Sequence, residues 1–267
     1  MRLRLWVSSA IVIAVLLYAY VIPYFSPYKD PMRWNQAPAD LPPSPKYIFG
    51  TTTLGQDLFW VNSFALRNSI NFGITTMAIA TTISLLVGVV SGYLRGKISV
   101  VLTTIIDAFC VIPALPIMVL ISALWVGGAY MVNFALLLSV FGWAWPARTI
   151  RSMILSLRER TFISTARFSG YRMLDLIVNE YLPYIFGAVF VSALNVILWA
   201  IGLETTLALF GLTSLGVPSI GTVMFWAMSY QALTRGIWWW ITFTVALLLT
   251  FIAALYLVAH EIYMKML

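Results

Sequence analysis

Long apolar runs separated by short polar stretches dominate this chain. Residues 5–25 and 68–94 carry no charge and are each long enough to cross a bilayer, which takes roughly 20 mostly apolar residues. A longer uncharged run, 108–147, exceeds one crossing at about 1.5 Å per residue, and Gly127 and Gly128 offer a natural break. The pattern predicts six spanning helices, at about residues 5–25, 68–94, 99–126, 130–147, 181–210 and 236–259.

These helices indicate an all-α integral membrane protein with a single domain over residues 1–267. We expect a first span (1–25), an external segment (26–67) and a five-span core (68–267) that includes a cytoplasmic loop (148–181). The first apolar run continues to about Phe25 without an obvious small-residue cleavage site, which favours an uncleaved span over a signal peptide. The external segment contains the proline cluster ADLPPSPKY, which favours extended, partly rigid backbone.

The basic residues near the ends of the spans predict the orientation, because cytoplasmic loops carry an excess of Lys and Arg. Six spans place both termini on one side, with 11 of the 16 basic residues: Arg2, Arg4, Arg95, Lys97, Arg148, Arg151, Arg158, Arg160, Arg167, Arg172 and Lys265. On the opposite side lie the other 5, which are Lys29, Arg33, Lys46, Arg67 and Arg235. We therefore expect both termini to be cytoplasmic.

Composition supports the membrane assignment and excludes other classes. Hydrophobic residues make up 61% of the chain and charged residues only 9%, whereas about a quarter of the residues in a soluble domain are charged. The net charge of +7 does not indicate nucleic-acid binding, because the basic residues are scattered at the edges of apolar runs. The single cysteine, Cys110, lies in an apolar run, and we interpret it as a packing residue.

One polar stretch between two apolar runs reads STARFSGYRMLDLIVNEYLP, residues 164–183. From Thr161 to Ser169 there is length for about two helical turns, and Gly170 permits a sharp change of direction. The plain interpretation is a solvated loop whose arginines obey the positive-inside rule. On composition alone, that interpretation and a functional one are equally supported.

The spacing of this stretch resembles the cytoplasmic "EAA" loop of ABC importer permeases. Ser164, Thr165 and Ala166 stand at the Glu-Ala-Ala triplet, Gly170 at the glycine after three further residues, and Leu182–Pro183 at the closing Leu-Pro pair. The preceding SLRERTF is similar to a run common before this loop in the dipeptide, oligopeptide and nickel branch. Ser and Thr replace Glu and Ala, so the triplet carboxylate is missing, and whether Glu159 replaces it stays open.

Two further stretches resemble the same branch. FGTTTLGQD, residues 49–57, is similar to its external Phe-Gly-Thr-Asp-x-Leu-Gly-Arg-Asp segment, with Gln56 where arginine is usual. DAFCVIPALP, residues 107–116, is similar to its Asp-x-Phe-x-x-x-Pro segment in the third span. Pro113 and Pro116 in this span predict a kink, because proline breaks the helical hydrogen-bond ladder.

This resemblance implies the MetI-like permease fold of type I ABC importers in the inner or plasma membrane of a prokaryote. The implied partners are a homologous second permease subunit, two ABC ATPase subunits, an extracytoplasmic substrate-binding protein and the lipid membrane. ATP and Mg would be bound by the ATPase subunits, and this chain would need no cofactor of its own. Indeed, the sequence has no GxxxxGK[ST] phosphate loop. The implied cargo is a peptide, an oligosaccharide or nickel.

The resemblance also assigns roles to particular residues. ATPase coupling falls on the loop residues Arg160, Thr161, Phe162, Ser164, Thr165, Ala166, Phe168 and Gly170. An external gate or docking surface for the binding protein falls on Phe49, Gly50, Leu54, Gly55 and Asp57.

Asp107 and Glu204 are the acids inside the predicted spans, where ionisable residues are costly and often functional. Both are possible pathway residues. Asp107 either orients helices or caps a cavity, or it takes part in a proton or ion relay. Glu204 either faces the translocation pathway or pairs with an arginine of the partner subunit. The alternative function is therefore an ion-coupled secondary transporter or channel that uses both acids. Residues 238–240, three tryptophans, predict an interfacial aromatic belt, with sugar stacking as the sharper alternative.

Overall fold

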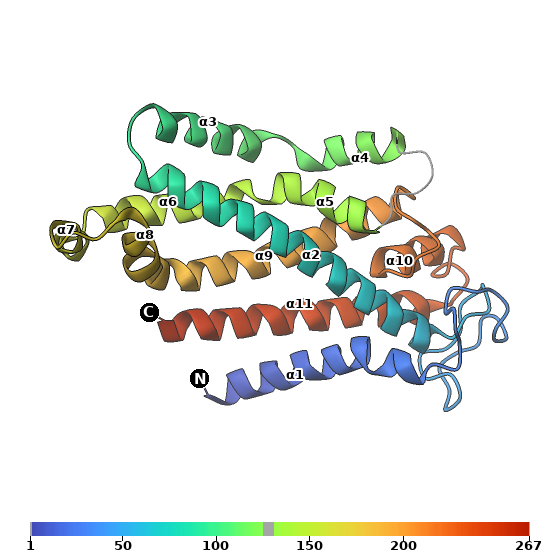
Figure 1. The fold of residues 1–267 in the computed structure, drawn as a ribbon. Coiled ribbons are helices and arrows are strands. Elements are labelled where there is room, and N and C mark those ends of the chain that lie inside the picture. The colour runs from blue at the N-terminus through green and yellow to red at the C-terminus, as the bar shows by residue number, and fades with distance from the viewer. Residues whose placement is uncertain (1, 125–130, 267) are drawn as a thin grey trace.

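A computed structural model describes residues 2–124 and 131–266, so the break predicted at Gly127 and Gly128 lies outside the described residues. Within those ranges the chain folds into helices and loops, and Figure 1 shows the long helices side by side in one bundle. The elements in chain order are α1 (Arg2–Tyr20), η1 (Ile22–Phe25), α2 (Leu58–Tyr93), α3 (Lys97–Val111), α4 (Ala114–Leu124), α5 (Met131–Gly142), α6 (Ala144–Arg158), α7 (Thr161–Phe168), α8 (Met173–Asp175), η2 (Leu176–Tyr181), α9 (Leu182–Leu209), α10 (Ile220–Ser229) and α11 (Trp238–Met266).

Helical segments long and apolar enough to cross a membrane are fewer than the six that we predicted. Within the described ranges, four segments meet this condition by length and composition, namely Trp6–Phe25, Leu58–Tyr93, Met173–Leu209 and Trp238–Glu261. The bent pair α3–α4 makes five if it counts as one span. The predicted fourth span, residues 130–147, falls on α5 and the start of α6, which are separate helices on either side of Trp143. The all-α membrane class is confirmed, and the sixth span stays a prediction.

The kink predicted in the third span is present. Ile112 leaves the helical conformation directly before Pro113, with φ −61° and ψ 122°, and α3 and α4 are bent by 75° relative to each other. A residue before proline is disfavoured in the helical region, and proline itself has no N–H to donate. The predicted reason and the observed position therefore agree.

Two predicted boundaries differ from the structure, and charged residues explain both differences. The second span was predicted from residue 68, after Arg67, but α2 begins ten residues earlier at Leu58. The fourth was predicted to end before Arg148, but α6 continues to Arg158. A charge ends an apolar run in the sequence, but it does not end a helix. The loop predicted at 148–181 is therefore helical over its first part.

The extended α6 packs closely against α2 through glycine. A Cβ added to Gly88 would lie 2.8 Å from the carbonyl oxygen of Ala147, and one added to Gly92 would lie 2.8 Å from Cβ of Ile154. Real Cβ atoms do not approach so closely, so the two helix backbones can touch here only because these positions are glycine. α2 and α6 therefore pack closely against each other near the α7 end of the bundle.

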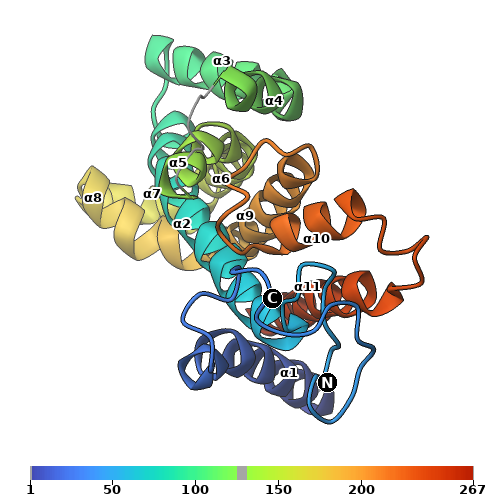
Figure 2. The same cartoon turned by 90° about the vertical axis from the view of Figure 1, so that its right-hand side faces the viewer.

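Both chain ends and α7 lie at one end of the bundle, whereas residues 26–57 and the connection from α10 to α11 lie at the other (Figure 1). Seen end-on, α1 and the pair α3–α4 lie on opposite sides of α2 (Figure 2). The two ends of the bundle are joined by α2, α9 and α11.

Candidate functional site

The helix α7, Thr161–Phe168, stands at one end of the bundle between α6 and α9. Arg160 before it is extended, and Gly170 after it has φ +87°, a left-handed conformation that favours glycine. The N–H of Tyr171 donates to the carbonyl of Ala166 across this glycine, at 3.2 Å, which closes the helix. The predicted two-turn helix and glycine turn are both confirmed.

One face of α7 is anchored to the bundle. Ile163 is fully buried in a cluster with α2, α6 and α9, and Phe162 packs its ring against Tyr184 with ring centroids 5.0 Å apart. Phe162 was expected to contact a partner, but part of its surface is buried within this chain. Phe168 is instead 91% exposed and presents its whole ring outward.

A surface hollow of about 420 Å³ lies beside α7. Its lining residues are Thr161, Phe162, Thr165, Ala166, Ser169, Tyr171 and Glu180. The hydroxyls of Ser164 and Thr165 donate to the carbonyl of Thr161, at 2.7 and 3.0 Å, and unlike a carboxylate they carry no charge. Glu180 brings a carboxylate to this hollow, and sequence reasoning, which considered Glu159, missed it. The sequence clue to Glu180 was its position shortly before Leu182–Pro183. It lies in η2, which places it beside α7.

The five residues expected to gate the outside lie mostly inside the external segment. Leu54 and Asp57 are buried, and Phe49 stacks on Phe243 of α11 with ring centroids 4.6 Å apart. Gly50 and Gly55 have φ +77° and +69°, and a Cβ on either would lie 2.7 Å from a carbonyl oxygen. These residues therefore set the shape of the segment rather than its outer surface.

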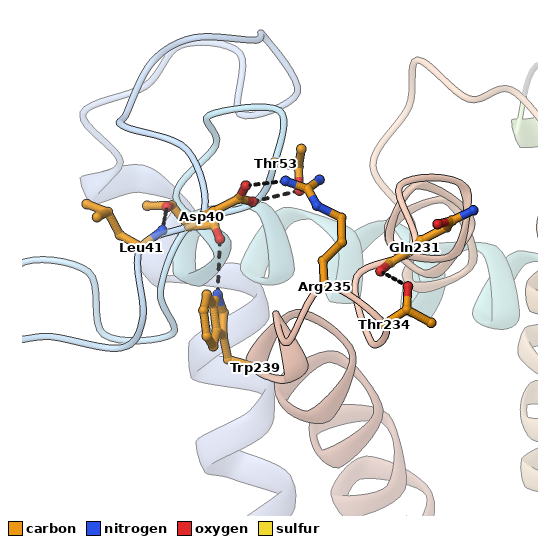
Figure 3. A network of polar contacts seen from close by, with 8 residues as sticks. Asp40, Leu41, Thr53, Gln231, Thr234, Arg235 and Trp239 are labelled. Carbon is orange, nitrogen blue, oxygen red and sulfur yellow. Dashed lines mark hydrogen bonds and ion pairs between the residues drawn. The ribbon is translucent and has the colours of Figure 1, made fainter.

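A polar clamp joins the segment to the start of α11 (Figure 3). The guanidinium of Arg235 lies 2.7 Å from the carboxylate of Asp40 and donates to the hydroxyl of Thr53 at 3.1 Å. The indole N–H of Trp239 donates to the carbonyl of Thr51 at 3.1 Å. Because both chain stretches were predicted to be external, their contact agrees with the predicted topology.

The three tryptophans at the start of α11 do not act alike. Trp239 and Trp240 are buried, whereas Trp238 is half-exposed. Only Trp238 has a ring face available to a membrane interface or a ligand, so the other two serve packing.

Asp57 caps α2. Its carboxylate accepts a hydrogen bond from the N–H of Phe59 at 3.1 Å, which satisfies one of the free amides at the helix start. Burial raises the pKa of the Asp57 carboxyl above its usual value of 3.8, and the bond from Phe59 opposes this shift. The carboxylate therefore has a structural partner in this chain.

Asp107 and Glu204 belong to different local structures. Asp107 on α3 lies 3.5 Å from Arg148 on α6, and both side chains are about half-exposed. Glu204 on α9 is buried and accepts a hydrogen bond at 2.6 Å from Ser219, the N-cap of α10. The two acids thus have separate partners in this chain, and their predicted roles stay predictions.

A second hollow of about 420 Å³ opens between α3, the α5–α6 junction and α9; we call it the α3–α9 hollow. It is lined by Phe109, Cys110, Ile112, Ala114, Phe141, Gly142, Trp145, Pro146, Thr149, Ser192, Asn195, Val196 and Trp199. Hydroxyl and amide groups, from Thr149, Ser192 and Asn195, interrupt its apolar wall. The hollow gives this chain a concave face along its spanning helices.

Comparison with known families identifies this combination of a spanning bundle, α7 and a glycine turn. The model of a family described as "binding-protein-dependent transport system inner membrane component" matches residues 84–263, which include α7, α10 and the α3–α9 hollow. The chain belongs to this family.

Individual relatives specify the branch. The oligopeptide transport system permease protein of Mycobacterium tuberculosis (strain H37Rv) is 31% identical over 205 residues, which cover 76% of this chain and 70% of the relative. The corresponding protein of Lactococcus lactis subsp. cremoris (strain SK11) is 25% identical over 94% of this chain and 86% of its own length. The dipeptide permease of Bacillus subtilis is 27% identical over 82% and 72%. The expected class, an ABC importer permease of the dipeptide/oligopeptide type, is confirmed.

Proposed function

We propose that this family member forms half of the translocation pathway of an ATP-driven importer whose cargo is a peptide. The relatives are named as oligopeptide and dipeptide permeases, which favours a peptide over an oligosaccharide or nickel. A homologous second permease would supply the other half, an extracytoplasmic binding protein would deliver the cargo, and two ATPase subunits would bind ATP and Mg. Both termini and α7 would face the cytoplasm, with six spans in all.

The observation that carries the proposal is the exposed end of α7. Its anchored face includes the fully buried Ile163, and its free face presents Phe168, Thr165 and Ser164 to the outside of the bundle. An aromatic side chain such as that of Phe168 is a common anchor residue at protein interfaces, where a partner's pocket buries the ring. Motion of a docked ATPase subunit would pass through Ile163 to α6 and α9, because these helices share its cluster.

The test is a single substitution with a matched control. Phe168→Asp should abolish co-purification of the ATPase subunits, or lower it about tenfold or more, because a charge would replace a buried anchor. Ile48→Asp, at the opposite end and 54% exposed, is the control for insertion and expression and should leave co-purification intact. Undiminished ATPase binding and transport in Phe168→Asp would refute the docking role.

Uptake measurements on the same complex distinguish the ATP-driven importer from the alternative function. An ion-coupled secondary transporter would move cargo without ATPase subunits and would respond to an ion gradient. Uptake that persists after the ATPase subunits are removed would therefore favour the alternative, while uptake that needs ATP supports the proposal.

A further inference from the structure

The ion pair between Arg148 and Asp107 lies one helical turn beyond residues that line the α3–α9 hollow. We propose that the guanidinium of Arg148 exchanges Asp107 for the terminal carboxylate of a peptide passing through this hollow. This inference rests on the proposed function and adds to it a residue that recognises the cargo.

Helix geometry places the pair next to the hollow. Asp107 lies one turn before Cys110 on α3, and Arg148 one turn after Trp145 on α6, and both Cys110 and Trp145 line the hollow. Residues three apart share a helix face, so the ion pair continues the lining toward the α7 end of the bundle. The pair joins the two walls by a contact of 3.5 Å.

The exposure of the pair restricts what can cover it. Asp107 lies within the bent α3–α4 pair, and a charge in a spanning segment is costly against lipid, so it faces protein or a water-filled cavity. Arg148 and Asp107 are about half-exposed in this chain, and Thr149 and Asn195 add polar groups on the same concave face. The volume of about 420 Å³ falls within the range of small-molecule sites, which suits a short peptide. Coverage by a partner chain is the competing arrangement.

The chemistry of the pair suits an exchange. Guanidinium groups bind carboxylates through two parallel hydrogen bonds, whereas an exposed ion pair contributes little stability of its own. A peptide carboxylate can therefore replace that of Asp107 at little cost. The peptide's ammonium group is of opposite charge to the released Asp107, so both charges of the pair stay compensated during the exchange.

The native cysteine provides the first test. Cys110 is the single cysteine of the chain and lines the hollow, so a water-soluble charged thiosulfonate reports on the access of water to it. The assembled transporter would be treated during ATP turnover, and modification of Cys110 would be measured by mass spectrometry of its own tryptic peptide. We expect modification that saturating cargo suppresses. The absence of modification in every state, with ATP-driven uptake intact, overturns this inference but not the proposed function.

The second test separates cargo recognition from helix orientation. The probe is an alanine-rich peptide chosen for the strongest ATPase stimulation, compared with its C-terminal amide in the same binding protein. Arg148→Gln should lower the uptake ratio of acid to amide about tenfold or more, because a hydrogen-bonded charge contact is lost. The uptake ratio of Arg148→Lys should lie between those of the wild type and Arg148→Gln, because lysine keeps the positive charge but cannot form the two parallel hydrogen bonds of a guanidinium.

Asp107→Asn is the matched variant, because it breaks the same pair and leaves Arg148 in place. It should retain the preference for the acid. If each variant, Asp107→Asn and Arg148→Gln, lowers the uptake of the acid and of the amide peptide by the same factor, the pair only orients α3 on α6, and the inference is wrong. Should Arg148→Gln fail to assemble, an unchanged ratio in Arg148→Lys would overturn it as well.

Discussion

Arg235 and Asp40 lie 2.7 Å apart, although 195 residues separate them in the chain. Both side chains are partly exposed, so the clamp should contribute only about 0.5–1 kcal/mol to the free energy of unfolding. Its effect on position is larger, because the same guanidinium also holds Thr53. The clamp thus fixes the external segment on the start of α11.

We predict that Arg235→Ala loosens the external segment without unfolding the bundle. Limited proteolysis between residues 26 and 57 should become several-fold faster, because the segment opens locally more often. Arg33→Ala, an exposed external arginine, is the control and should leave the cleavage rate unchanged. Equal rates in both variants would show that the clamp does not order the segment.

Glycine substitutions should separate backbone strain from steric clash. Gly50→Ala combines a positive φ with a Cβ at 2.7 Å from Leu41 O, whereas Gly236→Ala has a positive φ and open space around it. Gly216→Ala has open space and no positive φ. Thermal unfolding in detergent should show no decrease in the free energy of unfolding for Gly216→Ala, a decrease of about 1 kcal/mol for Gly236→Ala, and a distinctly larger one for Gly50→Ala. Any other order of stability would contradict the assignment of backbone strain to Gly236 and of strain plus a steric clash to Gly50.

Substitutions of Asp57 should separate its role as a cap from its charge. Asp57→Ala loses the bond to Phe59 and should destabilise the protein by about 1 kcal/mol. Asp57→Asn keeps an accepting oxygen but carries no charge. Because the pKa of Asp57 is raised on folding, the wild type loses stability as pH rises from the usual value of 3.8 through the folded-state pKa. The stability of Asp57→Asn relative to wild type should therefore increase over that window, as measured by unfolding between pH 4 and 8.

Glu204 and Ser219 should behave as a unit. Ser219→Ala removes the donor to a buried carboxylate whose second oxygen already lacks a partner among the described residues, so it should be strongly destabilising. Glu204, Ser219 and Ser214 line one small cavity of about 30 Å³, and Ser214→Ala is the control that should cost little stability. The double variant Glu204→Gln, Ser219→Ala should lose less stability than the sum of the single losses. Additive losses would show that the pair is not coupled.

The sequence predicted those parts of the fold that depend on local chemistry. The helix Thr161–Phe168, the turn at Gly170 and the kink before Pro113 each follow from one or two residues with strict backbone preferences. The start of α2 before Arg67 and the extension of α6 beyond Arg148 did not follow in this way, because a charge ends an apolar run without ending a helix.

The candidate site was predictable only in part, for the same reason. Spacing located α7, but the burial of Phe162 against Tyr184 depends on how α7 packs on α9. Likewise, Arg148 counted as an orientation signal in the sequence, and only packing placed it beside Asp107. Contacts between distant residues carry no local sequence pattern, so they had to come from the structure.

The helix α2 runs without a break from the Asp57 cap to Tyr93, 36 residues, or about 54 Å. At one end the N–H of Leu58 donates to the carbonyl of Gly50 in the external segment, and at the other end α2 packs against α6. A rod of this length amplifies rotation, since a tilt of about 5° displaces its far end by about 5 Å. Small rearrangements around Gly88 and Gly92 would therefore appear at the Asp57 end of α2 as displacements of several ångströms.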